Sequence, residues 1–481
     1  MTRFKLTDLF TYRHRYFIGY VITILIFVSL LVVAGLYIPG GMSQGEMTQF
    51  IKTSSMDIDK ASTLAIPNMP FFAVQRFSMD TLGLHIFTFK LPALICALFT
   101  GVGAVVLLRR WFRPNIAVLA TIIMITTGQF IYVAQSGSAD ITYILWSVWL
   151  LLIATMVTYS EKHKRLWRLL LAIVIPLSLY TPMSIYLVLA VLAAGIFHPH
   201  VRHVIKTVPR AEQIILPIIS ISLSIPLLIF VIMRPALLVE LLGAPASWPP
   251  DIAANLHTIF QQYFNFIHPS SGALMTPVLD LGSMILIAIG LWQQFKIRYT
   301  ARSYTLTAWI ILLVPVLIIN PALISVTFVP LLLLLASGLG YILRTWYAMF
   351  PRNPYARFVG VVPLAILVGG LVLSGLYRYF DGYRYDPLTA KSFTKDISLY
   401  SDEILGKNVK RIVVAKDEIR LYNAVAKYHK EVPIKVSTET PHDNEVYAAT
   451  SKAHKHIRAI PSKIITTNFS DDADRFYIYN N

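Results

Sequence analysis

Charged residues are scarce in this chain of 481 residues. Only 14% of the residues are charged and 56% are hydrophobic, whereas soluble domains are about 25% charged. Apolar runs of about 18 residues or more recur along the chain, which is the length needed to cross ~30 Å of hydrocarbon. The composition therefore excludes an ordinary soluble protein and predicts a mostly α-helical, polytopic membrane protein.

Cysteine is nearly absent. Cys96 is the single cysteine and lies in an apolar run, so neither an intrachain disulfide nor a cysteine metal cluster is possible. The sequence has no Gly-rich phosphate loop and no ATP motif. His85, His257 and His268 have no HxxxH or HExxH spacing, so a divalent metal stays possible but unsupported. No cofactor is predicted with certainty.

Long hydrophobic passes are abundant instead. We expect about 11 of them, near 17–38, 89–108, 116–134, 141–159, 167–180, 183–198, 213–233, 276–295, 304–319, 322–342 and 358–376. The first pass is too long for a signal-peptide core and ends in no small-residue cleavage site, so it is expected to be a retained span. The pair 167–180 and 183–198 is either two short spans or one span kinked at Pro182.

The formal charge of +17 is distributed as topogenic charge. Lys and Arg cluster in short segments between the passes, such as "RRWFRPN" and "KIRYTARS", whereas the alternate turns "SGSAD", "YTPMS" and "INP" have none. The positive-inside rule then places the N-terminus in the cytoplasm. We expect a multi-pass protein of the cell (plasma) membrane, the bacterial cytoplasmic membrane in particular, and no nucleic-acid partner.

The composition changes near Tyr377. Residues 1–377 are expected to form the transmembrane domain, with outer loops at 39–88 and 234–275. Residues 378–481 are polar and contain "VKRIVVAKDEIRLYNAVAKYHKEVPIKV", which favours strand, helix and strand. This segment is expected to be a small extracytoplasmic α/β domain. It includes "NFS" at Asn468, which matches a glycosylation sequon.

Acids that a membrane protein keeps at its surface are functional candidates. On the expected outer side they are Glu46, Asp57, Asp59, Asp80, Asp140, Glu240, Asp251 and Asp280. Glu46 opens a segment whose apolar spacing predicts a short helix on the outer surface; the alternative is that it only favours a helix N-terminus. Asp140 precedes the fourth pass, and its alternative is a helix N-cap.

Few cations lie on the same side before the tail. They are Lys52, Lys60, Arg76, Lys90 and Arg234. Lys90, Arg76 and Arg234 are candidates for an electropositive rim that binds a lipid-linked phosphate. The alternative for membrane-edge Lys90 and Arg234 is that their side chains only snorkel toward water.

Four features of the first 160 residues, in this order, resemble a known class. They are "SQGEMTQFIKTSSM" after the first pass, "NMPFFAVQRFS", "FKLPALICALFTG" and "AQSGSADITYILWSVWLLL". The order and spacing resemble the GT-C class of integral-membrane glycosyltransferases, in particular protein O-mannosyltransferases and lipid A aminoarabinose transferases. The short paired passes around "YTPMS" and the polar tail fit this class as well.

The resemblance implies a polyprenyl-phosphate sugar donor and an outward-facing active site with an acid in the first outer loop. Glu46 matches the Glu of the class's Asp-Glu pair, and Gly45 stands where the Asp is usual. Lys90 matches the basic residue that opens the second span, and Asp140 matches the acid of the fourth. Asn68 stands where a phosphate-contacting Lys is frequent and Met69 replaces a Pro. The chain has either moved its chemistry to Glu46 and Asp140 or lost catalysis.

The leading hypothesis is an inverting membrane glycosyltransferase. It would move a sugar from a polyprenyl-phosphate donor to a protein, glycan or lipid acceptor on the outer side. Glu46 is the expected base, Asp140 a positioning or second acid, and Lys90, Arg76 and Arg234 the donor-phosphate partners. Glu46→Gln is expected to remove transfer and spare folding. The alternatives are a catalytically silent GT-C-like protein that binds lipid-linked sugars, and a lipid or sugar transporter.

Overall fold

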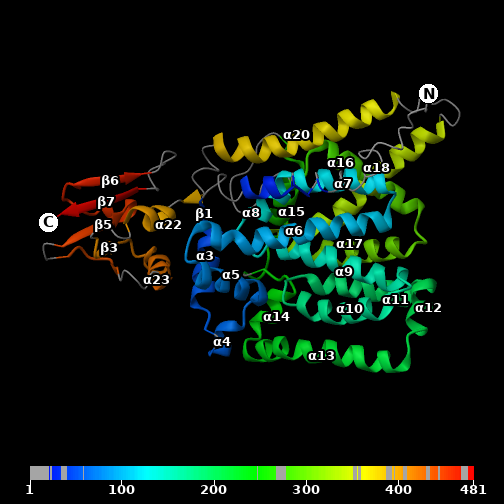
Figure 1. Ribbon diagram of the computed structural model, residues 1–481, viewed down its shortest axis with the longest axis horizontal. Coiled ribbons are helices and arrows are strands. Elements are labelled where there is room, and N and C mark those ends of the chain that lie inside the picture. The colour runs from blue at the N-terminus through cyan, green and yellow to red at the C-terminus, as the bar shows by residue number, and fades with distance from the viewer. Residues whose placement is uncertain are drawn as a thin grey trace, which may run out of the picture.

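The computed structural model describes most of the chain. The described residues are 21, 24–25, 27–33, 41–57, 59–245, 247–266, 278–349, 355, 359–385, 393–394, 396–404, 409–428, 434–441, 445–466 and 475–480. Helices form one large body, and a five-stranded sheet lies beyond one end of it (Figure 1). His268 and Asn468, singled out in the sequence, lie outside the described residues.

The helical body contains long helices that run side by side along the long axis of Figure 1. Its elements are α3 (Gln44–Ser55), α4 (Ala61–Leu64), α5 (Met69–Leu82), α6 (Ile86–Trp111), α7 (Pro114–Thr126), α8 (Gly128–Gln135), α9 (Ile141–Tyr159), α10 (Lys164–Ser178), α11 (Ser184–Phe197), α12 (Pro199–Lys206), α13 (Arg210–Met233), α14 (Ala236–Leu241), α15 (Ile252–Phe264), α16 (Leu281–Lys296), α17 (Ala301–Ile319), η2 (Pro321–Thr327), α18 (Phe328–Met349) and α20 (Val361–Tyr385). The expectation of a mostly helical protein is confirmed.

Six helical segments among the described residues are long and apolar enough to cross a membrane, and up to eight if two bent pairs each count as one span. The bent pairs are α7 with α8, at 59°, and α11 with α12, at 89°. The expectation of 11 passes is thus reproduced only in part. Helices α10 and α16 occupy expected passes but have 15 and 16 residues, fewer than the ~20 that span a bilayer.

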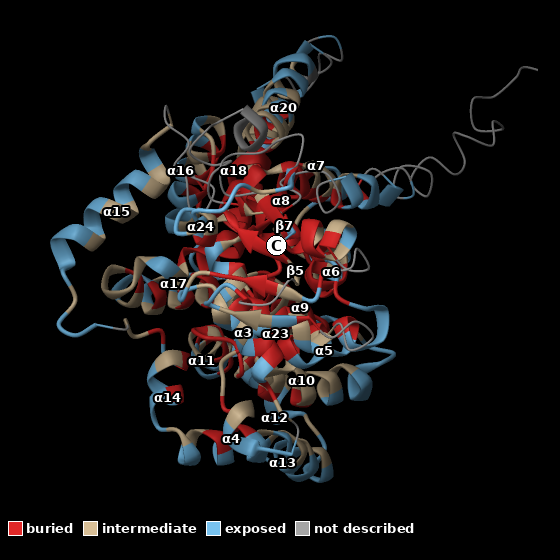
Figure 2. Ribbon diagram, turned by 90° about the vertical axis from the view of Figure 1, so that its left-hand side faces the viewer, coloured by how far each residue is buried: buried red, intermediate tan, exposed pale blue. Residues whose placement is uncertain are grey.

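Buried residues concentrate in the middle of the helical body, whereas α13 and α15 at its periphery are largely exposed (Figure 2). Helices α16 and α18 approach closely at Gly290 and Gly338. A Cβ on Gly290 would lie 1.9 Å from the Leu334 carbonyl oxygen, and one on Gly338 would lie 2.0 Å from that of Leu286. Small residues permit such contacts between apolar helices, so these two glycines fix how α16 packs on α18.

The described strands of the C-terminal part form a mixed sheet of order β4-β3-β5-β7-β6. The strands are β3 (Arg411–Val413), β4 (Lys435–Ser437), β5 (Val446–Thr450), β6 (Lys463–Thr466) and β7 (Arg475–Asn480). Strand β3 pairs in parallel with β4 and β5, whereas β7 pairs antiparallel with β5 and β6. Helix α23 (Ile419–Tyr428) connects the parallel strands β3 and β4, as the strand, helix and strand pattern predicts. The short helices α22 (Asp396–Leu399), η3 (Tyr400–Ile404) and α24 (Ser451–His454) flank this sheet.

The sheet is joined to the helical body at α3. The side chain of Lys427 on α23 donates to the Ser54 carbonyl at 3.0 Å, and the Phe50 ring lies 6.0 Å from that of Tyr428. Strand β1 (Met42–Ser43) pairs antiparallel with β2 (Phe393–Thr394). Phe50, on the apolar face of α3, is buried in this contact. The face expected on the outer surface is therefore packed against the C-terminal part.

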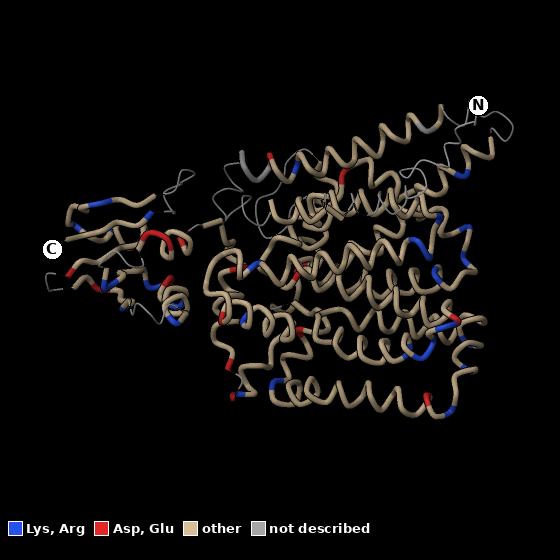
Figure 3. The backbone as a smooth tube through the Cα atoms, viewed as in Figure 1, with Lys and Arg blue, Asp and Glu red and all other residues tan. Residues whose placement is uncertain are grey.

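Lys and Arg gather at the end of the helical body opposite the sheet (Figure 3). This end contains the segments that connect α6 to α7, α9 to α10 and α12 to α13. Acidic residues are few throughout the helical body. The two ends thus differ in charge as the sequence predicts.

Candidate functional site

Helix α3 begins with a reciprocal cap that fixes Glu46. The Ser43 hydroxyl oxygen accepts from the Glu46 backbone N–H at 3.2 Å, and the Glu46 carboxylate accepts from the Ser43 N–H at 2.7 Å. This S-x-x-E arrangement satisfies N–H groups that a helix start leaves unpaired. The expectation that the segment is helical is confirmed, and part of the role of Glu46 is to begin the helix.

Glu46 also pairs with Lys90 inside the protein. The Lys90 Nζ lies 3.6 Å from the Glu46 Oε1 and donates to the Gln135 Oε1 at 3.0 Å. Lys90 is 0% and Glu46 1% exposed. Lys90 therefore does not snorkel toward water, and its charge is balanced within the protein, because an unpaired buried charge is strongly unfavourable.

The turn between α8 and α9 closes over this pair. The Gly137 N–H donates to the Glu46 Oε1 at 2.5 Å, and the Gly137 carbonyl accepts from the Gln75 amide at 2.8 Å. A Cβ on Gly137 would lie 1.9 Å from a carbon of the Phe89 ring. Only glycine therefore lets this backbone lie between Glu46 and Phe89.

Asp140 ends the same turn and is half-buried. Its Oδ2 accepts from the Ser138 hydroxyl at 2.8 Å, and the Ser138 hydroxyl oxygen accepts from that of Ser136. Asp140 precedes α9 but makes no side-chain cap to that helix, so the N-cap explanation is wrong. Burial and the nearby Glu46 charge raise the pKa of Asp140 above the usual aspartate value, although the hydrogen bond from Ser138 acts to lower it.

Gln135 is the residue of this site that the sequence analysis missed. It is fully buried, and its Nε2 has no hydrogen-bond partner among the described residues. Gln129 also lies on α8, and neither its amide nitrogen nor its amide oxygen has a hydrogen-bond partner among the described residues. Buried amides are usually paired. The sequence "GQFIYVAQ" contains a hint of this site, because two glutamines lie near the ends of an otherwise apolar helix.

Arg76 and Arg234 lie apart from Glu46 and Lys90. Arg76 pairs with Asp80 on the same helix, with Nε and Oδ2 3.4 Å apart. Arg234 donates to the Ala65 carbonyl at 3.0 Å and pairs with Glu240 at 2.5 Å. The structure thus brings together Glu46, Lys90 and Asp140 of the predicted residues, and it shows no contact of these three with either arginine.

Asn68 and Thr142 link the start of α5 to the start of α9. Asn68 has a φ of +55°, its N–H donates to the Tyr180 carbonyl at 2.7 Å, and its side chain accepts from the Thr142 hydroxyl at 3.0 Å. A pocket of about 170 Å³ adjoins this link and is lined mainly by apolar side chains, including Phe71, Pro92 and Trp146. Thr142, which lines this pocket, is two residues from Asp140 in the sequence.

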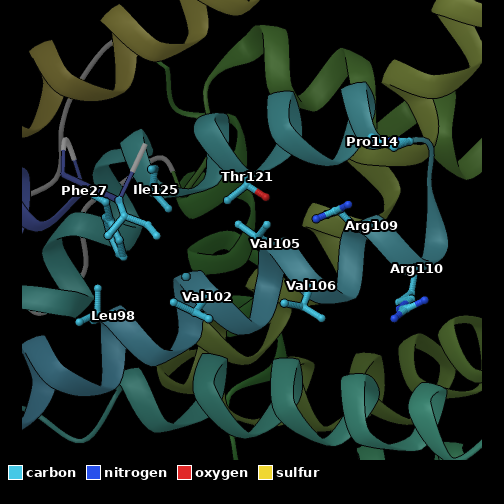
Figure 4. A pocket seen from close by; sticks show the side chains of 12 residues that line it. Phe27, Leu98, Val102, Val105, Val106, Arg109, Arg110, Pro114, Thr121 and Ile125 are labelled. Carbon is cyan, nitrogen blue, oxygen red and sulfur yellow. The ribbon is translucent and has the colours of Figure 1, made fainter. Parts of the chain in front are cut away.

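Another cavity, of about 410 Å³, lies between α6, α7 and the described part of the first helix, with Arg109 and Arg110 near one end (Figure 4). Arg109 is 19 residues beyond Lys90 on α6, which corresponds to about 28 Å along a helix. The basic end of this cavity thus lies far from Glu46. Among the described residues, no group of three or more His, Cys, Asp or Glu is arranged to bind a metal.

One family model matches part of the chain. Residues 67–234 match the family model of dolichyl-phosphate-mannose-protein mannosyltransferases. The matched segment includes Lys90 and Asp140 and begins after Glu46. No curated protein sequence matches the chain.

Solved structures share the fold over nearly the whole chain. ArnT from Cupriavidus metallidurans in the apo state superposes with a TM-score of 0.51 at 12% identity, covering 96% of this chain and 98% of that one. The same protein bound to undecaprenyl phosphate gives 0.53 at 11% identity, covering 97% and 98%. An Archaeoglobus fulgidus oligosaccharyltransferase tethered to an acceptor peptide gives 0.51 at 11% identity, covering 90% of this chain and 64% of that one. The resemblance to GT-C membrane glycosyltransferases, expected from the first 160 residues, is confirmed.

Proposed function

We propose that this protein is a membrane glycosyltransferase that moves a sugar from a polyprenyl-phosphate donor to an acceptor by inversion. The family model over residues 67–234 supports transfer from a lipid phosphate sugar, and the fold shared with ArnT and the archaeal oligosaccharyltransferase supports the same class. We place the reaction at the end of the helical body next to the sheet. The opposite end is rich in Lys and Arg and is therefore the cytoplasmic one.

The observation that carries this proposal is the turn that joins Glu46 to Asp140. Glu46 is buried and accepts from two backbone N–H groups, those of Ser43 and Gly137. Asp140 is half-buried, and its Oδ1 has no hydrogen-bond partner among the described residues, whereas its Oδ2 accepts from Ser138. A carboxylate oxygen with a free lone pair is what a general base requires.

We therefore assign the base to Asp140 and a positioning role to Glu46. In the transfer step the acceptor hydroxyl oxygen attacks the anomeric carbon, and its proton moves to Asp140. The bond between that carbon and the phosphate oxygen breaks, and its electron pair leaves with the polyprenyl phosphate. Glu46 holds Gly137, and with it the turn that presents Asp140, in one geometry. This division differs from the expected one, in which Glu46 is the base.

The donor phosphate requires positive charge. Lys90 lies within the site but is fully buried and bound to Glu46 and Gln135. We propose that Lys90 supports phosphate binding through its field, since its ammonium group lies at the same turn. Arg76 and Arg234 remain proposed phosphate partners, and each would have to exchange its present carboxylate for phosphate. The apolar pocket beside Asn68 is the proposed place for the first isoprene units.

The test is release of labelled sugar from lipid by the purified protein in detergent, with a panel of polyprenyl-phosphate sugars. Wild type should release label from one donor, and Asp140→Asn should lower the rate by 10²-fold or more. Asp59→Asn is the matched control, because Asp59 is an exposed acid outside the site. Equal rates in wild type and Asp140→Asn would overturn the assignment of the base.

A second function is favoured by the residues at the start of α3. Gly45, in the exposed first turn of α3, provides no carboxylate, and Glu46 beside it is 1% exposed. A silent protein that binds lipid-linked sugars would show both features. It predicts tight binding of a polyprenyl-phosphate sugar with no label release from any donor, in wild type and in all variants.

A further inference from the structure

A further cavity, outside the candidate site, lies at the basic end of the helical body. Its volume is about 570 Å³, and residues of α9, α10, α11, α12, α17 and the last residue of α6 line it; Figure 1 shows where these helices lie. Most of its lining is aliphatic. Three lining residues are cationic, namely Arg202, Lys206 and Arg302, and none is acidic.

Helix α12 gives this groove its shape. It turns by 89° from α11, and its sequence "PHVRHVIK" contains both basic and aliphatic residues. Arg202 and Lys206 are four residues apart, so they lie on one face of the helix. A short amphipathic helix across the end of a bundle is typical of a segment that lies at the membrane surface.

The cations of the groove are available to a ligand. The side chains of Arg202 and Lys206 are exposed and form no hydrogen bond or ion pair with any described residue. Arg302 is anchored by one bond, from its Nη1 to the Trp111 carbonyl at 2.8 Å, and its guanidinium lies 5.0 Å from the centre of the Phe112 ring. A guanidinium has five N–H donors, so most of those of Arg302 remain for an anion.

We propose that this groove binds an anionic phospholipid of the adjacent leaflet. The aliphatic walls of α9 and α11 take an acyl chain, and the phosphate lies among Arg202, Lys206 and Arg302. A cationic cluster without any acid discriminates against zwitterionic headgroups, because their ammonium group would meet only positive charge. This site is separate from the proposed transfer site, and the proposal does not depend on glycosyl transfer.

The experiment counts bound lipids by native mass spectrometry of the full chain released from detergent. Phosphatidylglycerol and phosphatidylcholine are offered at equal concentration. Wild type should retain one phosphatidylglycerol in preference to phosphatidylcholine. Arg202→Gln with Lys206→Gln should weaken phosphatidylglycerol binding by about 25-fold, at about fivefold for each charge removed.

The control is Lys162→Gln with Lys164→Gln. Both lysines are exposed and lie at the same end of the helical body, outside the groove: Lys162 lies between α9 and α10, and Lys164 is the first residue of α10. This pair should bind as wild type does. An equal loss in the control, or no preference for phosphatidylglycerol in wild type, would overturn the proposal, because either result indicates only a basic surface.

A second variant tests the apolar part of the groove. Gly195 lines it, and a Cβ there would lie 3.0 Å from the end of the Ile205 side chain, which can move. Gly195→Leu should fill the groove and release the lipid while the basic residues stay in place. Competition by inorganic phosphate as strong as that by phosphatidylglycerol would contradict the proposal, since it would show a site for free phosphate.

Discussion

Replacing Lys90 by Met tests the buried ion pair directly. The Lys90 Nζ and the Glu46 Oε1 are 3.6 Å apart, which corresponds to an attraction of about 5 kcal/mol at an effective dielectric of about 20. Removing one partner of a buried pair costs about 3–5 kcal/mol. Glu46 would keep the Ser43 and Gly137 N–H donors, so we expect a loss near the lower end, about 3 kcal/mol.

The reciprocal change, Glu46→Gln, should cost more. It removes the negative charge that balances the buried Lys90 ammonium, which keeps the Gln135 side-chain oxygen as an acceptor. Both Glu46 oxygens accept from backbone N–H groups, so the new amide nitrogen must face one of those donors. We expect about 5 kcal/mol. From the sequence we expect this change to spare folding, whereas from the buried pair we expect it to lower stability.

The assay is thermal unfolding of the purified protein in detergent, followed by intrinsic fluorescence. For 481 residues at about 2.1 cal/mol/K each, the unfolding entropy is about 1 kcal/mol/K, so Tm should fall by about 3 °C in Lys90→Met and about 5 °C in Glu46→Gln. The double variant removes both charges and should be more stable than Glu46→Gln alone. If the two losses add instead, the pair does not exist and the reasoning fails.

Three further outcomes follow from the same site. Gly137→Ala should lower stability by about 1–3 kcal/mol, measured as a Tm shift, because its Cβ would lie 1.9 Å from the Phe89 ring; Phe89→Leu should restore part of the loss. Gly45→Asp should raise Tm slightly, since the nearest atom to its Cβ is 3.9 Å away and an acid is favourable in the first turn; a clear loss of stability would contradict this. The raised pKa of Asp140 predicts that sugar release falls with decreasing pH at a midpoint above the usual aspartate value, as the base becomes protonated; a pH profile that Asp140→Asn leaves unchanged would argue against it.

The broad architecture can be predicted from the sequence because hydrophobic length and charge are local properties. The alternation of Lys and Arg between segments predicts that these residues gather at one end of the helical body, and Figure 3 shows that they do. Span number is harder, because helices such as α10 are shorter than the bilayer and α7 bends into α8 by 59°. Hydropathy averaged along the chain does not detect such a bend.

The candidate site can be predicted only in part. Glu46, Lys90 and Asp140 are prominent as isolated charges, and the structure brings them to one turn. Gln135 was missed because an amide in an apolar helix carries no charge and matches no motif. The pairing of Lys90 with Glu46 joins residues 44 positions apart, and no periodicity in the sequence specifies that contact.

The different surroundings of Glu46 and Asp140 decide which of them can do chemistry. A general base accepts a proton from the substrate, and this requires a lone pair that the substrate hydroxyl can reach. Both oxygens of the buried Glu46 carboxylate already accept from backbone N–H groups, and Oε1 also faces an ammonium group. Protonating Glu46 would therefore disturb the cap of α3 and the Gly137 turn. Asp140 has one oxygen held by Ser138 and one without a partner in the described part of the chain, so it can accept a proton without any such rearrangement. In a chain with Gly45 in place of an acid, the buried pair therefore maintains the geometry and Asp140 is the carboxylate left to act on a substrate.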